Sequence, residues 1–239
     1  MFEKLKKFSS SWTATFLYIF LFMSFGFQAF KIPSGSMETT LLIGDSLFVK
    51  KFSYGIPTPY IPFFNVNIIP GTDGHLVDWG TPKRGEIVVF RLPQNNRVFY
   101  VKRLIGLPGD KLFMVDKVLY MNFKEGKKWM IEHYNRDQIV TIDNLTWVKN
   151  PFFKKYPGIH NTDEFVKAPS IDREPTFNFP VTEVPENEYF MLGDNRDNSK
   201  DSRYIGTVPF GLFLGNPAFI FFSSSPDKFR LNRIFSVPE

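Results

Sequence analysis

The sequence of 239 residues contains no cysteine and only three histidines, His75, His133 and His160. The absence of cysteine excludes a thiol nucleophile, a disulfide framework and any zinc or iron–sulfur site that depends on cysteine. Three scattered histidines leave little material for a histidine-based metal site, so we expect no metal and no cofactor.

An excess of one charge is also nearly absent, since 29 basic residues face 24 acidic ones and the net charge is +5. A small positive charge fits nucleic acid or an anionic membrane surface as partner but requires neither, and we expect no nucleic acid. The hydrophobic content of 43%, with 29 phenylalanines, is too high for a disordered chain. The length predicts one domain, or one domain with a sizeable insertion.

One long segment without charge is present near the N-terminus. Residues 8–30 carry no charged side chain, and residues 12–30 would span about 28 Å as a helix, close to the thickness of a membrane. A buried core helix would show polar residues at helical spacing, yet only Ser24 and Gln28 interrupt the run after Thr15. A cleaved secretory signal would end in small residues, whereas this run ends at Phe30. We therefore expect a membrane anchor at 12–30.

Lysines set the expected orientation of this anchor. Lys4, Lys6 and Lys7 precede it and only Lys31 follows closely, and lysine-rich flanks stay in the cytoplasm. Residues 1–11 are thus predicted to be a cytoplasmic tail, and residues 31–239 an exported domain. No second hydrophobic stretch reaches spanning length, so the lipid bilayer is an expected partner through a single pass.

The exported part predicts a mainly β fold. Its apolar runs are short, rich in valine, isoleucine, phenylalanine and tyrosine, and bounded by glycine, proline and asparagine. They lie at residues 46–52, 86–92, 98–105, 111–121, 188–192 and 218–223. Residues 113–185 differ, being polar and irregular, and are expected to form an inserted subdomain or a set of long surface loops without chemistry.

Two clusters offer catalytic groups, each with an ordinary alternative. Ser34, Gly35 and Ser36 form a small-residue turn that can expose a hydroxyl beside backbone N–H groups, or they can be a simple linker. Lys102 lies in a predicted strand among apolar residues, where the pKa of a lysine falls and the amine can act as a base. The alternative is an edge-strand lysine that reaches to solvent, and Arg103 on the opposite face is better explained in that way.

The third cluster, residues 193–203, is dense in aspartate, asparagine, serine and arginine. It fails as a calcium loop because the ligand and glycine positions do not match. We interpret Arg196, Asp197, Asp201 and Arg203 as an ion-pair network that makes the loop rigid. Ser225 and Lys228 match a Ser-x-x-Lys pattern that is expected once by chance, so we predict a turn there.

Together, and in this order, these segments resemble bacterial type I signal peptidases. The matching stretches are residues 33–41 with 43–45, 84–90, 102–110, 193–203 with Gly206, and 230–234, about half of the exported part. Thr39 departs from the family, which usually has proline there. The single membrane span also differs from relatives that have two.

The resemblance implies a role for each matching residue. Ser36 is the nucleophile, Lys102 is the general base, and Ser34 joins the Ser36 N–H in an oxyanion hole. Ser199 orients the lysine, with Asp197, Asp201 and Arg203 as supporting residues. The implied substrate-pocket residues are Phe30, Ile32, Leu47, Tyr100 and Val101. Because no histidine lies in a motif, hydrolysis would use a hydroxyl and an amine.

The implied substrates are preproteins bearing signal peptides with small residues at −1 and −3, processed at the bacterial inner membrane with the catalytic domain outside the cytoplasm. The export machinery is a further candidate partner. Two alternatives remain at this point: a specialised peptidase that matures one secretion or conjugation partner, and a non-catalytic, membrane-tethered domain that binds export substrates.

Overall fold

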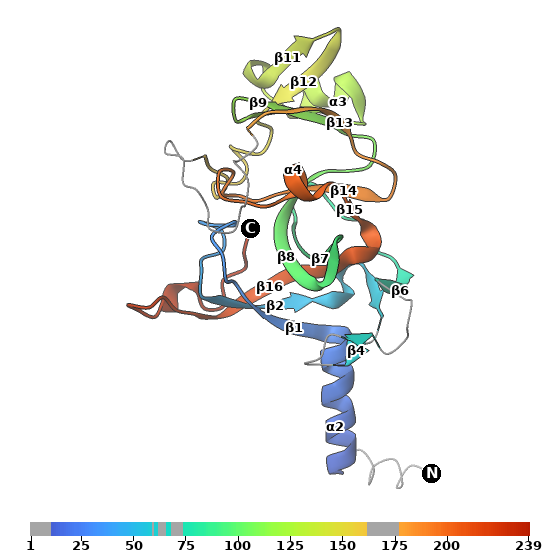
Figure 1. Ribbon diagram of the computed structural model, residues 1–239, viewed down its shortest axis with the longest axis vertical. Helices are drawn as coiled ribbons and strands as arrows, with labels where there is room; N and C mark the ends of the chain where they lie inside the picture. Colours follow the sequence, from blue (N-terminus) through green and yellow to red (C-terminus); the bar gives the residue numbers. More distant parts are fainter. Residues whose placement is uncertain (1–10, 59, 62–65, 68–73, 162–176) are drawn as a thin grey trace.

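A seven-stranded antiparallel sheet forms the body of the computed structural model, which describes residues 11–58, 60–61, 66–67, 74–161 and 177–239 (Figure 1). In spatial order its strands are β1 (Phe27–Lys31), β2 (Asp45–Lys50), β16 (Phe213–Ser223), β7 (Ile87–Leu92), β8 (Asn95–Gly106), β14 (Glu188–Leu192) and β15 (Val208–Pro209). The mainly β prediction is confirmed.

A second sheet of five strands lies at the far end of the molecule from the N-terminal helix (Figure 1). Its order is β11 (Ile139–Ile142), β12 (Leu145–Lys149), β10 (Val118–Asn122), β9 (Lys111–Val115) and β13 (Phe179–Glu183). The run at 111–121, expected as one strand, is a hairpin, because Asp116 and Lys117 adopt positive φ and turn the chain between β9 and β10.

The remaining elements are short. Two-stranded sheets pair β3 (Gly55–Pro57) with β6 (His75–Asp78) and β4 (Tyr60–Ile61) with β5 (Val66–Asn67). Two short helices connect strands: α3 (Gly126–His133) lies between β10 and β11, and α4 (Ser202–Ile205) lies between β14 and β15. Turns of 3-10 helix occur at Lys51–Ser53, Arg136–Gln138, Phe210–Leu212 and Leu231–Arg233.

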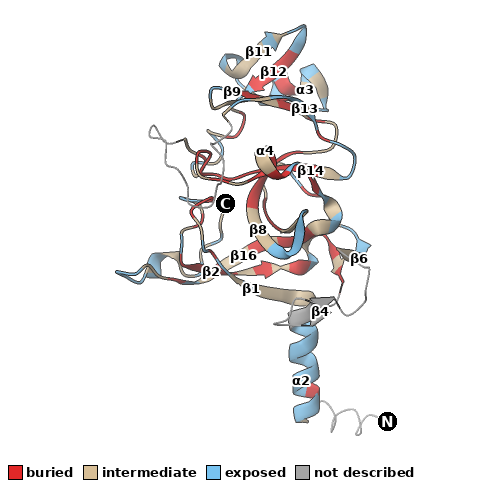
Figure 2. Cartoon of the chain, in the orientation of Figure 1, coloured by how far each residue is buried: buried red, intermediate tan, exposed pale blue. Residues whose placement is uncertain are grey.

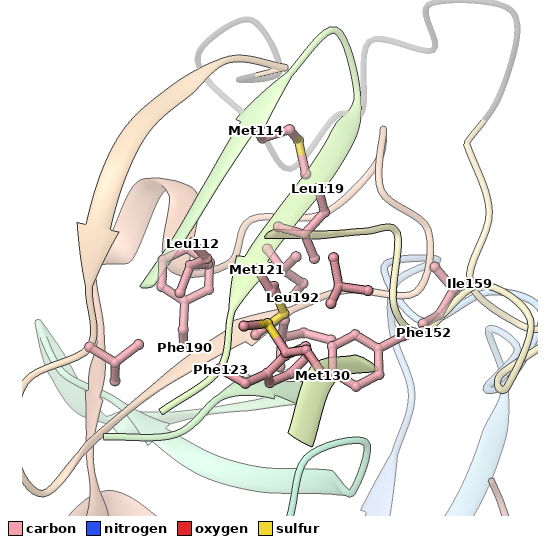
Figure 3. Packing of buried hydrophobic residues seen from close by; sticks show 13 residues of the cluster. Leu112, Met114, Leu119, Met121, Phe123, Met130, Phe152, Ile159, Phe190 and Leu192 are labelled. Carbon is pink, nitrogen blue, oxygen red and sulfur yellow. The ribbon is translucent and has the colours of Figure 1, made fainter. Parts of the chain in front are cut away.

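Three apolar clusters hold the sheets together. The alternation of β7 sends Ile87 and Val89 to one face of the large sheet and Val88 and Phe90 to the other, and each pair belongs to a separate buried cluster. A third cluster joins the sheets, since Leu112 and Met121 of the small sheet pack with Phe190 and Leu192 of β14, and the figure shows these side chains converging (Figure 3).

The expected anchor at 12–30 is wrong at its C-terminal end. Helix α2 (Trp12–Leu21) continues as a π-helical turn (Phe22–Gly26), after which Phe27 begins β1. Phe27 and Phe30 continue the apolar run in the sequence, but they belong to the sheet, because β1 pairs with β2 along its whole length. Among the described residues, no helix is long and apolar enough to cross a membrane.

Candidate active site

The loop between β1 and β2 carries Ser36. Main-chain hydrogen bonds hold its two ends, and buried apolar side chains hold its middle. At its ends, the Ile32 N–H donates to Asp45 O and the Gly44 N–H to Ile32 O. Within the loop, Met37 and Leu41 are fully buried in the apolar cluster that contains Val49. The apolar side chains that follow Ser36 therefore fix the position of the serine.

Lys102 reaches this serine from the middle of β8, where it lies opposite Val88 of β7. Its Nζ lies 2.6 Å from Ser36 Oγ and 2.8 Å from Val101 O. Both side chains are buried, with only 8% of Ser36 and 4% of Lys102 exposed. The structure thus brings together the two residues to which the resemblance gives the nucleophile and base roles.

Burial lowers the pKa of Lys102 from 10.5 to about 8. The carboxylates of Asp201 and Asp194 oppose this shift, and the Arg203 guanidinium adds to it. A lysine with this pKa is neutral in an appreciable fraction of molecules near neutral pH, and a neutral amine can accept a proton from Ser36.

The region beside Ser36 offers donors for a developing oxyanion. No acceptor for the Ser36 backbone N–H is found among the described residues. Ser34 is half-buried, and its hydroxyl forms no hydrogen bond with any residue that the structure describes. Both groups are therefore available to a ligand, as an oxyanion hole requires.

The loop at 193–203 supports the pair from the other side. The Asn195 N–H donates to Ser36 O at 3.2 Å, and the Gly193 N–H donates to the Asp201 carboxylate. Asp201 and Arg203 form a buried ion pair with an Nε–Oδ1 distance of 2.8 Å. Burial raises the pKa of Asp201, but the Arg203 charge, together with the hydrogen bonds that the carboxylate accepts, outweighs burial and lowers this pKa below its usual value.

Ser199 is almost fully buried, at 1% exposure, and lies against Gly193. The hydrogen bond to Lys102 that its expected orienting role requires is not formed in this structure, since Nζ donates to Ser36 Oγ and Val101 O. The orienting role of Ser199 stays a prediction.

The expected ion-pair network reaches beyond the loop at 193–203. Asp201 pairs with Arg203, as predicted, but Asp197 pairs with Lys117 of the small sheet at 3.2 Å. Arg196 is held through main-chain atoms, because its Nε donates to Gly193 O and its carbonyl accepts from Arg203 Nη2. The sequence could not show Lys117 because it lies in a distant segment.

Arg103 corrects a second expectation. It is 1% exposed and does not reach to solvent. Its guanidinium binds the Asp194 carboxylate with two hydrogen bonds, of 2.7 and 2.6 Å, and donates a third to Gly85 O. A long basic side chain can be buried here because a buried carboxylate neutralises it.

Four of the five expected pocket residues gather on one face of the large sheet: Phe30, Ile32, Leu47 and Val101 share one apolar cluster. Tyr100 lies on the opposite face, with its ring 5.2 Å from Lys102 Nζ. Leu47 is fully buried, while Phe30, Tyr100 and Val101 are partly exposed. The exposed three are therefore the better candidates for substrate contact.

The sequence did not indicate that the segment around His160, which follows β12, lies beside the supporting loop. The His160 N–H donates to Asp194 O, and His160 O accepts from the Arg196 N–H, so this segment runs alongside the supporting loop. The contact uses the main chain, and no pattern in the sequence marks it. Within the described ranges, no three histidine, aspartate or glutamate side chains gather as metal ligands.

A buried serine and lysine, joined at hydrogen-bond distance in a mainly β fold, define the class of serine hydrolases that use a lysine as base. The family described as "Signal peptidase, peptidase S26" matches residues 5–222. The chain belongs to this family.

Three relatives illustrate the similarity of this chain to signal peptidases I. A signal peptidase I of Helicobacter pylori strain J99 is 38% identical and covers 91% of this chain and 82% of its own length. One from Rickettsia typhi is 39% identical over 82% of this chain and 72% of its own. One from Buchnera aphidicola is 32% identical over 95% of this chain and 80% of its own.

Proposed function

We propose that this protein is a signal peptidase I, a serine endopeptidase that removes signal peptides from exported preproteins, with Ser36 as nucleophile and Lys102 as general base. The observation that carries the assignment is the 2.6 Å separation of Lys102 Nζ and Ser36 Oγ in a buried site. The relatives' names supply the substrate class. They do not favour a specialised maturation peptidase or a non-catalytic binder.

The reaction starts with neutral Lys102, which accepts the Ser36 hydroxyl proton while Oγ attacks the scissile carbonyl carbon. The Ser36 N–H and the Ser34 hydroxyl stabilise the resulting oxyanion. When the peptide bond breaks, the protonated lysine gives its proton to the leaving amine and an ester on Ser36 remains. Lys102 then takes a proton from water, whose oxygen attacks the ester; as the ester bond breaks, Lys102 returns this proton to Ser36 Oγ and the acid product leaves.

The substrate would lie extended between two strand edges. Strand β1 is the end strand of the large sheet, and Asn95–Lys102 of β8 have no partner on the side of β14 in the described part of the chain. The rings of Phe30 and Phe99 meet edge to face at 5.2 Å between these edges. Bulky side chains at this point leave room only for small substrate residues beside the scissile bond.

A membrane attachment is part of the proposal. Trp12, Phe16 and Phe22 of the helical N-terminal segment are 83, 67 and 58% exposed, and Figure 2 shows α2 exposed except at the buried Ala14. Such a surface needs an apolar environment. With the lysines at 4, 6 and 7, it supports a single-pass anchor, a cytoplasmic N-terminus and a catalytic domain outside the bacterial inner membrane.

Further lipid contact and the domain division are also proposals. Trp79 is 58% exposed and suited to a membrane interface. From the sequence we propose Phe63 and Phe64 as further interface anchors, and both lie outside the described residues. The small sheet, built from segments between Lys111 and Glu183, is the proposed inserted subdomain expected at 113–185. The export machinery remains a candidate partner.

The test is cleavage of a preprotein with an Ala-x-Ala site by the full chain in detergent, with mapping of the cut. Ser36→Ala and Lys102→Ala should each lower turnover roughly 10⁴-fold or more, because the two residues act as one unit. Ser225→Ala is the matched control, since Ser225 only closes a turn with Lys228 and should leave the rate unchanged. Appreciable cleavage by either dyad variant would contradict the assignment.

A further inference from the structure

The segment around Gly158 crosses both loops of the proposed active site. It leaves the small sheet after β12, and Gly158 O accepts a hydrogen bond from Thr39 Oγ1 of the Ser36 loop. Two residues later, the His160 N–H binds the carbonyl of Asp194 in the supporting loop. One short segment therefore contacts the chain on either side of the dyad.

The Asp194 carboxylate connects the nucleophile to the base. Its Oδ2 accepts a hydrogen bond of 2.5 Å from Thr40 Oγ1, and the same oxygen lies 2.6 Å from Arg103 Nη2. Thr40 follows Ser36 in its loop, and Arg103 is the neighbour of Lys102 in β8. Through one fully buried carboxylate, the loop that carries Oγ is tied to the strand that carries Nζ.

Gly158 leaves the space that this connection needs. A Cβ at position 158 would lie 2.0 Å from Thr40 Oγ1, 3.3 Å from Thr40 Cβ and 3.4 Å from Asp194 Oδ2. The first distance is a collision, whereas the other two are tight but tolerable contacts. A side chain at 158 would therefore act on the Thr40 hydroxyl before anything else.

We propose that Thr40, covered by Gly158, is a positioning residue that holds the Ser36 loop on Asp194 and so sets the distance between Ser36 Oγ and Lys102 Nζ. Thr40 does not touch the reacting atoms. Its loss should misplace the nucleophile by a fraction of an ångström, which lowers the rate of acylation more than the binding of substrate. This inference rests on the proposed function.

Kinetics of full-length variants in detergent test the role of Thr40. Thr40→Val, which keeps the shape but removes the hydroxyl, should lower kcat on an Ala-x-Ala preprotein roughly 10–100-fold and leave KM within about threefold. Thr40→Ser retains the donor and should keep most of the wild-type kcat. Thr182→Val is the matched control, because it removes a threonine hydroxyl that donates to Pro180 O in β13, and it should change neither constant.

A double-mutant cycle tests the role of Gly158. Gly158→Ala should lower kcat in the wild-type background but add little to Thr40→Ala, since alanine at position 40 has no Oγ1 to be displaced. If Gly158→Ala does not fold, the comparison of Thr40→Val with Thr40→Ser still tests the positioning role of Thr40. A Thr40→Val kcat within threefold of wild type, equal losses in Thr40→Val and Thr40→Ser, or losses that match a fall in the folded fraction would each overturn the proposal.

These outcomes remain distinct from failure of the function itself. If either Ser36→Ala or Lys102→Ala keeps appreciable cleavage, the proposed peptidase mechanism fails. If those two variants are inactive while Thr40→Val is fully active, the mechanism stands and only the positioning role is lost.

Discussion

At the scale of single residues, Lys102 combines an ordinarily charged side chain with a buried position. Its surroundings are the dyad serine, a main-chain carbonyl and the ring of Tyr100. The nearby carboxylates of Asp194 and Asp201 limit the fall of its pKa to about 8. The residue is thus protonated in most molecules at neutral pH, and neutral in about one in ten.

The rate of cleavage should follow the neutral form of Lys102. Below a pKa of about 8 the amine gains a proton and cannot act as base, so kcat/KM should fall tenfold per pH unit and level off above pH 8. Measurement of kcat/KM from pH 5.5 to 9.5 on one preprotein checks this. A profile flat down to pH 6 would show that another group is the base.

Lys102 should also reduce stability at neutral pH. A pKa lowered from 10.5 to about 8 means that folding disfavours the charged lysine by about 3 kcal/mol below pH 8, and this loss is recovered as pH rises toward 10.5. We expect Lys102→Met to be inactive but to raise Tm at pH 7, with a smaller gain at pH 10. A Tm of Lys102→Met below that of the wild type at both pH values would contradict the claim that buried Lys102 destabilises the fold.

At the scale of elements, the loop at 193–203 affects both the stability of the fold and the pKa of Lys102. Asp201 binds Arg203 and the Gly193 N–H, and its charge also raises the pKa of Lys102. Asp201→Asn should cost about 3–5 kcal/mol of unfolding free energy, because it leaves the Arg203 charge buried without its partner.

The same substitution should move the acidic limb of the kcat/KM profile to lower pH. Removal of the Asp201 charge takes away an interaction that stabilises protonated Lys102, so the pKa of Lys102 falls further. Urea unfolding and the pH profile measure the two effects. Asp137→Asn is the control, because Asp137 and Lys154 form an exposed pair that contributes about 0–1 kcal/mol. An unchanged limb in a folded Asp201→Asn variant would contradict the electrostatic link.

The elements that the sequence predicted well are those with a clear apolar run between turn residues. Strand β14 matches the prediction at 188–192, and β7 and β2 differ from theirs by a residue or two at the ends. Strand β1 was missed because Phe27 and Phe30 continue the apolar run of α2. Strands β11, β12 and β13 were missed because they are short, of four or five residues each, and lie within residues 113–185, a stretch that is polar and irregular as a whole.

The candidate site was predictable only through the motifs taken together. Alone, Ser36 suited a linker and Lys102 an edge strand, and only the ordered resemblance singled them out. Arg103 was misread because its partner Asp194 lies 91 positions further along the chain. The approach of His160 to Asp194 uses main-chain groups, which every residue has, so no side-chain pattern could reveal it.

At the scale of the whole molecule, β1 belongs to both the N-terminal segment and the catalytic sheet. All five of its residues pair with β2, and the Phe27 ring packs against Phe48 and Phe52. Removal of the helix and removal of the strand should therefore have different consequences.

A chain that begins at Phe27 should keep the thermal stability of the catalytic sheet, whereas one that begins at Ile32 should lose roughly 2 kcal/mol or more, since Phe27 and Phe30 lose their contacts. Thermal unfolding of both variants in the same detergent measures the difference. Equal Tm values would show that β1 contributes nothing to the sheet.

The passage from α2 to β1 without an intervening loop has a consequence for how far the enzyme can reach. A flexible tether would let the catalytic centre sweep a volume and sample bonds at many heights. Here the π-helical turn leads straight into a paired strand, and Ser36 follows within one short loop. With α2 as the proposed membrane anchor, this rigid connection would hold Ser36 at one distance from the bilayer, and we expect efficient cleavage only of preproteins whose scissile bond lies at that distance.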